Sequence, residues 1–307
     1  MTRVASFAQS QALLQGILNN QSRIFEAQKQ VNTGKKTDEF RGIASQTSTL
    51  VGAKSLLART QSYLNAGAEA DRTISAYDVQ LNFILENARN LRQTVLEAIS
   101  NNEAVGFGGI LGDAFNLITS ALNTKVGGKF LFSGSRSDQP AVNTTTLSDL
   151  IALPTASDAF DNDQLKASTR VTDGFDLSYG VLAEDIGSGL FASIKRLAEF
   201  NAGPGGPIDG ALTAAQRTFL EGELQQLDGA IQTAQNQQVL NGLNAKKLGE
   251  VLDLQRGQTA FLEVFVADIE DVDIAEAITR LNNDRTALEA SYRVVGSVSR
   301  LSLVQFL

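Results

Sequence analysis

The chain has 307 residues, of which 43% are hydrophobic and 20% charged, so it can bury a large core and is not globally disordered. Its formal net charge of -8 argues against nucleic acid or an anionic membrane as a routine partner. The absence of Cys and His excludes disulfides, thiolate zinc sites, Ser-His-Asp triads and most zinc hydrolases. We therefore expect no enzyme activity, no catalytic or metal-binding residues and no cofactor.

The N-terminal stretch MTRVASFAQSQALLQG has no apolar core of the length that a cleaved signal needs. No run in the chain approaches the roughly 18 apolar residues of a membrane helix. If the protein leaves the cell, we expect it to use a route that does not read a cleavable signal.

Both flanks of the chain are free of proline, because Pro140, Pro154, Pro204 and Pro207 all lie in the middle. In the first flank, apolar residues recur at three- and four-residue steps and predict an amphipathic helix that ends near Thr33-Gly34. The apolar residues of this stripe are Val4, Phe7, Leu14, Ile17, Leu18, Ile24, Phe25 and Val31.

A second helical pattern runs from about residue 43 to residue 100, which corresponds to a rod of roughly 85 Å. A helix of that length needs partner helices along it, as in a coiled coil. A loop at 101–109, a shorter helix at 110–124 and a strand at 129–132 are expected to follow.

Residues 136–186 differ in composition, with many Thr, Ser, Asp and Asn and nine acidic residues against three basic ones. Short β-like runs at 168–171 and 175–181 predict a small, β-containing, solvent-facing insert. A helix is expected at 189–200, followed by a break at AGPGGPIDG.

The long helical pattern returns at 213–268 despite five internal glycines, which indicates that packing stabilises it more than intrinsic propensity does. Asp273 and Glu276 then have the spacing of a helix start. The final helix follows with near-heptad apolar residues.

These elements predict a mainly α fold, an elongated antiparallel helical rod or coiled coil formed by the N- and C-terminal arms. We expect an assembly helix and turn at 1–42, the rod at 43–135 and 187–269, the insert at 136–186 and a second assembly helix at 270–307. The predicted assembly interface is apolar and consists of Phe7, Leu14, Ile17, Leu18, Ile24, Phe25, Ile274, Ile278, Leu281, Leu288, Tyr292 and Val295. From pattern alone, the same stripes could equally form the core of a monomeric bundle.

Other motifs are weaker. Asp158, Asp161 and Asp163 have short spacing for Ca²⁺, but the EF-hand Gly and closing Glu are missing, so a solvated acidic loop is favoured. The 127–129 segment lacks the upstream spacing of a phosphate loop, and 106–109 is interpreted as a loop. No Ser stands beside a desolvated Lys in the pattern.

The segment IEDVDIAEAITRLNNDRTALEASYRVVGSVSRLSLVQFL resembles the C-terminal signature of the bacterial flagellin superfamily. Residues 21–36 are similar to that family's first helix and Gly-Lys turn. Residues 128–140, GKFLFSGSRSDQP, are most similar to its hook-associated protein 3 branch. The family's acidic segment after the first turn is replaced here by TDEFRG at 37–42, so the resemblance does not extend to the contacts of that turn. The residues that carry the C-terminal resemblance are Ile269, Asp271, Asp273, Ala275, Glu276, Ala277, Leu288, Ala290, Ser291, Leu301, Ser302 and Leu303.

The resemblance implies a structural subunit of the bacterial flagellum, exported unfolded through the flagellar secretion channel and self-assembling through its terminal helices. It implies further copies, the preceding hook-associated junction protein, filament flagellin and a cytoplasmic export chaperone as partners. The first hypothesis is a hook–filament junction subunit, the second a filament flagellin, and the third a cell-surface ligand-binding homologue that uses its insert.

Overall fold

The computed structural model describes residues 2–39, 42 and 45–304. It is mainly α, as predicted, with short two-stranded antiparallel sheets between the helices. In chain order the elements are α1 (Thr2–Thr33), α2 (Thr47–Asn101), β1 (Glu103–Ala104), α3 (Phe107–Leu122), β2 (Lys125–Val126), β3 (Lys129–Phe130), α4 (Leu147–Ala152), the 3-10 turn η2 (Ala156–Ala159), β4 (Ser168–Thr172), β5 (Phe175–Ser178), α5 (Ala183–Ala202), β6 (Gly210–Ala211), α6 (Ala214–Glu270) and α7 (Ile274–Val304).

Two predicted helix ends are confirmed by their local geometry. Helix α1 ends at Thr33, and Gly34 follows with a positive φ of 70°, a conformation that glycine adopts without steric cost. At the start of α7, the carboxylate of Asp273 accepts the backbone N–H of Glu276 at 3.1 Å. Short-range chemistry therefore sets both boundaries.

Three connections differ from the sequence expectation. The predicted loop 101–109 contains β1, which pairs with β6 about a hundred residues later in the chain. Helix α5 begins at Ala183, six residues before the predicted start. The strand expected at 129–132 is reduced to Lys129–Phe130, because the side chains of the two following residues are buried in the core. Two-residue strands have no periodicity to read, so only the long-range pairing reveals them.

The chain forms two compact units. The terminal unit combines Met1–Arg59 with Gln258–Leu307, and the central unit is Thr60–Gly257. No helix within the described residues is long and apolar enough to cross a membrane.

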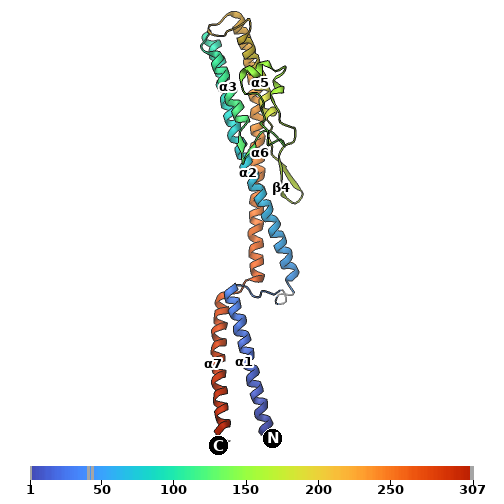
Figure 1. Cartoon of the computed structure of the whole chain (residues 1–307), viewed down its shortest axis with the longest axis vertical. Helices are drawn as coiled ribbons and strands as arrows, with labels where there is room; N and C mark the ends of the chain where they lie inside the picture. The colour runs from blue at the N-terminus through green and yellow to red at the C-terminus, as the bar shows by residue number, and fades with distance from the viewer. Residues whose placement is uncertain (1, 40–41, 43–44, 305–307) are drawn as a thin grey trace. The chain divides into compact units, whose positions relative to one another are not determined.

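In the central unit, α2 and α6 run side by side, and α3, α5 and the insert pack against them (Figure 1). Leu81 and Ile84 of α2 and Leu227 of α6 are completely buried in this seam. Phe191 of α5 meets Phe115 of α3 with ring centroids 5.2 Å apart, and it also meets Phe160 of the insert at 5.0 Å. Aromatic rings thus join three parts of one core.

The insert at 136–186 contains α4, η2 and the hairpin β4–β5. Val171 and Leu177 of that hairpin are buried in a second, smaller cluster with Ile74 of α2 and Leu248 and Leu252 of α6. The hairpin therefore has its own apolar anchorage on the long helices.

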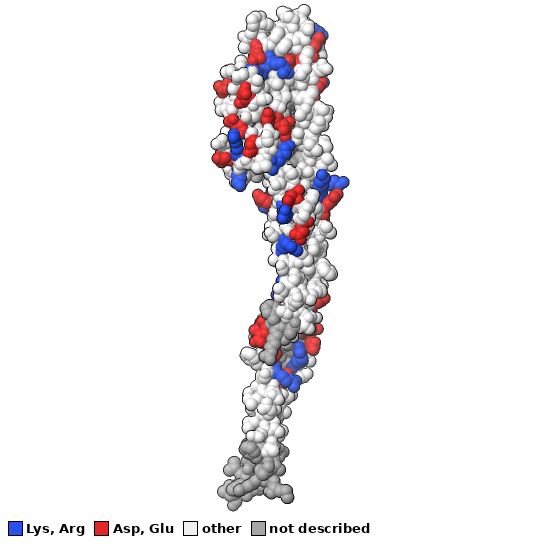
Figure 2. All heavy atoms as spheres, turned by 90° about the vertical axis from the view of Figure 1, so that its right-hand side faces the viewer, with Lys and Arg blue, Asp and Glu red and all other residues white. Residues whose placement is uncertain are grey.

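Charged side chains of both signs are interspersed over the face that carries the insert (Figure 2). Arg170 pairs with Asp176 at 2.8 Å, and Lys166 pairs with Asp185 of α5 at 2.7 Å. Two of the three basic residues of the insert are thus paired with carboxylates, and its acidic residues outnumber its basic ones.

Two glycines make a matched test of this packing. A Cβ at Gly187 would stand 2.8 Å from the ring of Phe160 and 3.1 Å from Leu122, whereas a Cβ at Gly242 would meet nothing within 4 Å. We expect Gly187→Ala to lower the free energy of unfolding by about 1–2 kcal/mol, because the rigid ring must move. Gly242→Ala should raise it by roughly 0.5–1 kcal/mol through helix propensity. Urea unfolding of both variants checks this, and equal effects of the two would contradict the packing.

Candidate assembly interface

Within the terminal unit, α1 and α7 pack as an antiparallel pair, so that the start of α1 and the end of α7 lie at the same end of the pair (Figure 1). Backbone hydrogen bonds fix the register where the two helices meet their connections. The N–H of Lys36 donates to the carbonyl of Glu270 at 2.7 Å, and the N–H of Val272 donates to the carbonyl of Gly34 at 2.9 Å. The turn after α1 is therefore paired with the turn before α7.

A cluster of charges secures the same junction. The ammonium of Lys35 lies 2.7 Å from the carboxylate of Asp271 and 3.2 Å from that of Glu270, which also pairs with Lys54 of α2. The hydrogen bond from Lys54 is the largest cause that holds the pKa of Glu270 below its ordinary value; burial opposes it and Lys35 adds to it. The ionised form of Glu270 is thus the one the fold prefers.

This preference gives a pH prediction. Because the pKa of Glu270 is lowered in the folded state, its stabilising contribution is complete above the ordinary value of about 4.5 and is lost as the pH falls through the lowered value. Glu270→Gln should therefore lower the thermal midpoint at pH 7, and its difference from the wild type should shrink on acidification below about pH 4.

Thermal unfolding at a series of pH values measures this difference. Glu276→Gln is the matched control, since that carboxylate lies on an exposed part of α7, 3.8 Å from Arg280. A difference that stays constant down to pH 3, or one shared by the control, would show that the charge cluster contributes nothing specific.

The contact between α1 and α7 is narrow. Its buried apolar side chains are small or few: Ile17 and Ala27 from α1, and Ala277 and Leu281 from α7. Asp284 of α7 is also buried.

Polar contacts flank this seam. The Asp284 carboxylate pairs with Arg23, the amide of Gln21 donates to the hydroxyl of Tyr292 at 2.8 Å, and Arg280 donates to Gln30 at 3.1 Å. Since small side chains let helix backbones approach closely, the pair is held by a thin apolar seam edged with polar bonds.

The predicted interface residues fall into four groups. Ile17 and Leu281 are buried between the helices, and Ile24, Leu288 and Val295 are half-buried. Phe7 lies in α1, but its side chain is outside the described part of the structure. The remaining six are exposed in the single subunit: Leu14, Leu18, Phe25, Ile274, Ile278 and Tyr292.

The exposed residues of α1 share one face of the helix. At about 100° per residue, Leu14, Leu18 and Phe25 fall within an arc of about 40°, roughly 110° round from the buried seam. Leu18 is 58% exposed and Phe25 67% exposed. A row of large apolar side chains left in water marks a surface that fits a partner better than solvent.

Sequence reasoning missed the small and charged members of the seam. Ala277 and Asp284 were missed, although they are spaced by four, three and four residues with the predicted Leu281 and Leu288, so heptad spacing could have found them too. The sequence prediction favoured large apolar residues, and it therefore also selected Ile274, Ile278 and Tyr292, which are exposed in the single subunit.

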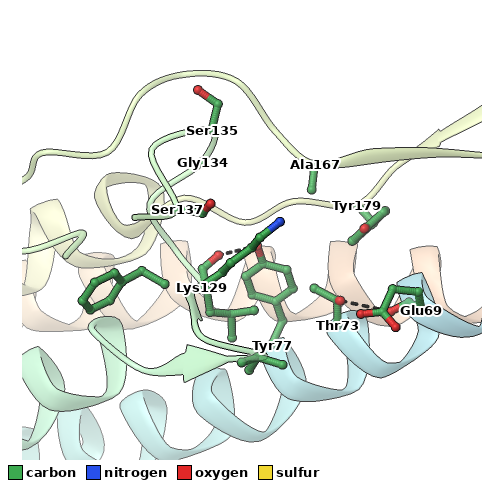
Figure 3. Close-up of a pocket in the computed structure, with 12 residues that line it drawn as sticks. Glu69, Thr73, Tyr77, Lys129, Gly134, Ser135, Ser137, Ala167 and Tyr179 are labelled. Atoms are coloured by element: carbon green, nitrogen blue, oxygen red, sulfur yellow. Dashed lines mark hydrogen bonds between the residues drawn. The ribbon is translucent and has the colours of Figure 1, made fainter. Parts of the chain in front are cut away.

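The central unit contains a cavity of about 330 Å³ between α2, the β2–β3 hairpin and the insert (Figure 3). Tyr77 donates its hydroxyl to the carbonyl of Leu131 at 2.6 Å, and burial raises the pKa of Tyr77 to about 12. Burial also raises the pKa of Tyr179, with a further contribution from Glu69 and an opposing hydrogen bond with Thr73. Both phenols stay protonated near neutral pH, and that of Tyr77 fastens the hairpin to α2.

Two of the three aspartates weighed as Ca²⁺ ligands, Asp158 and Asp163, form hydrogen bonds within the insert. The Asp158 carboxylate accepts from the N–H and the hydroxyl of Thr155, each at 2.9 Å. The Asp163 carboxylate accepts the N–H groups of Ser135 at 2.9 Å and Leu165 at 3.1 Å. These carboxylates cap and tie loops, in keeping with the interpretation as an acidic loop.

Two solved structures are similar to this fold. A protein described as a flagellar hook-associated protein from Vibrio parahaemolyticus superposes with a TM-score of 0.59 at 17% sequence identity, covering 76% of this chain and 99% of that one. FlgL of Bacillus cereus superposes with a TM-score of 0.52 at 14% identity, covering 71% of this chain and 99% of that one. The chain shares the fold of these flagellar proteins. The resemblance seen in the terminal segments is confirmed at the level of the fold.

No protein-family model matches the chain, and no curated protein matches it. At such low identity the likeness establishes the arrangement of helices and not the role of individual residues.

Proposed function

We propose that this chain is a structural subunit of the bacterial flagellum that forms the hook–filament junction by self-assembly through α1 and α7. The observation that carries the self-assembly part of the proposal is the row of exposed apolar side chains on the terminal pair. Leu14, Leu18 and Phe25 stay in water in one copy, although α1 is already packed against α7. Neighbouring copies would bury this row and gain its hydrophobic free energy.

The fold supports the flagellar setting, because both similar structures are named as flagellar proteins or FlgL. The preceding hook-associated junction protein and the first filament flagellins are the proposed axial neighbours. Export would proceed through the flagellar secretion channel with a cytoplasmic chaperone, and a chain without cysteine can pass such a channel without disulfides to reduce.

Localisation on intact flagella tests the junction role. Antibody raised against the insert should label a single band at the distal end of the hook in electron micrographs. Label along the whole filament would mean that the protein is a filament flagellin and not a junction subunit. An exposed apolar row suits a filament flagellin equally well.

A seeding experiment separates the same two roles in solution. Purified protein added to filament fragments should bind their ends without growing long tubes if it is a junction subunit. Continuous elongation would identify a flagellin.

A third role, as a cell-surface ligand-binding protein, draws on the cavity beside the insert, with Lys129, Glu69 and several hydroxyl groups at its wall. That role would be favoured if the full chain binds a ligand and this binding is unchanged when Leu18→Asp and Phe25→Asp disrupt the apolar row.

A further inference from the structure

Helix α6 carries a row of exposed leucines, interrupted by two charged residues, on the side facing away from its own core. We define the outer row as Leu240, Leu243, Lys247, Glu250, Leu254 and Gly257, all of which are exposed and belong to the central unit. At about 100° per residue the row lies roughly 150° round the helix from the buried Leu248 and Leu252. Helix α6 therefore has leucines on two nearly opposite sides, and within the described residues only one of these sides is covered.

The residues of the outer row follow steps of three, four, three, four and three, which is the a/d spacing of a coiled coil. Leu243 is 49% exposed and Leu254 is 70% exposed. Two charged residues, Lys247 and Glu250, occupy the central positions. Polar residues at such positions set the register and orientation of a helix pair.

We propose that the outer row binds a second copy of this chain, with the two α6 helices antiparallel and related by a two-fold axis near residues 248–249. In that register Lys247 lies opposite Glu250 of the second copy, and Leu243 lies opposite Leu254. Leu240 lies opposite Gly257. Because of the two-fold axis each contact occurs twice, so the outer row is complementary to the same row of the second copy.

Charge selects this orientation. A parallel pair in register would place Lys247 against Lys247 and Glu250 against Glu250, which is repulsive. The antiparallel pair replaces both repulsions with attractions. Within its own subunit Glu250 has only a surface contact with Lys246 at 4.0 Å, so it is available for the second copy.

Gly257 supplies the space that the register needs. A Cβ at this position would meet nothing within 4 Å in the subunit, so no internal packing explains a glycine in mid-helix. In the proposed pair, the missing side chain accommodates Leu240 of the other copy. The row is short, about 27 Å of helix, so the complex is expected to be weak and reversible.

Sedimentation velocity of the full-length protein across a concentration series tests the charges. Lys247→Glu and Glu250→Lys should each weaken dimerisation by about tenfold or more, because each creates two like-charge contacts. An equimolar mixture of the two variants should dimerise again, since each then meets the opposite charge. Failure of the mixture to recover, or single variants that dimerise like the wild type, would overturn the proposal.

Disulfide trapping tests the register, because the natural chain has no cysteine. Leu243→Cys mixed with Leu254→Cys should cross-link under mild oxidation much faster than either variant alone, since only opposed positions satisfy disulfide geometry. Faster Leu243→Cys self-cross-linking would mean a parallel pair and would contradict the antiparallel one. If the cysteine variants do not cross-link but the protein still binds filament ends, the α6 pairing alone is refuted. If the dimer is trapped but the protein does not bind flagellar parts, only the proposed junction role is refuted.

Discussion

Removing residues 270–307 is expected to abolish assembly completely while the central unit stays folded. The deletion takes away α7, the partner of Ile17 and Ala27, and with it the charge cluster around Glu270. Helix α1 would then expose both its seam and its second apolar row, and a lone helix of this kind is marginal in water. Binding to filament fragments and electron microscopy measure the loss of assembly.

The central unit has its own core, so its cooperative thermal transition should survive the deletion. A point variant refines the test without removing a helix. Leu288→Asp places a charge in the half-buried seam and should impair assembly strongly, whereas Asn283→Asp adds the same charge on the exposed side of α7 and should not. Normal assembly of the truncated protein, or equal effects of the two point variants, would contradict the proposed role of α7.

Lys195→Met is expected to lower the free energy of unfolding of the central unit by about 2–4 kcal/mol. The ammonium of Lys195 on α5 donates to the carbonyls of Leu150 at 3.2 Å, Ile151 at 2.8 Å and Leu153 at 2.7 Å, and it pairs with Glu199 at 2.9 Å. These carbonyls end α4, and Lys195 is only 8% exposed. Methionine retains much of the length and apolar contact but leaves the carbonyls without their charged donor.

Urea unfolding measures this loss, and Lys246→Met is its matched control. Lys246 has a side chain that is 76% exposed and only a 4.0 Å contact with Glu250, so its replacement should change stability by less than about 0.5 kcal/mol. Limited proteolysis should also show faster cleavage near α4 in Lys195→Met. Equal stabilities of the two variants would show that Lys195 does not fasten the insert.

The long helices were predictable from the sequence because their apolar period repeats over many turns. Thr33-Gly34 and Asp273 set helix ends through local geometry, and the structure agrees with both. A further local signal was overlooked: Thr213 and Gln216 form a reciprocal capping box, with bonds of 3.2 and 2.9 Å, at the start of α6.

Other features depended on groups far apart in the chain. The pairing of β1 with β6 joins two dipeptides, and two residues are too few to show the alternation of apolar and polar side chains that predicts a strand. Lys195 looks like an ordinary helical lysine until the fold places the end of α4 against it. Likewise Asp284 stands on a heptad position, but only its bond to Arg23 explains a carboxylate there.

The sequence by itself determined that this is a mainly helical chain with long terminal helices, because helix formation and capping depend on residues within a few positions of one another. Only the tertiary structure decided which apolar side chains are covered. Burial depends on how closely two helices approach, and Ala27 and Ala277 bring α1 and α7 together while Leu18 and Phe25 remain in water.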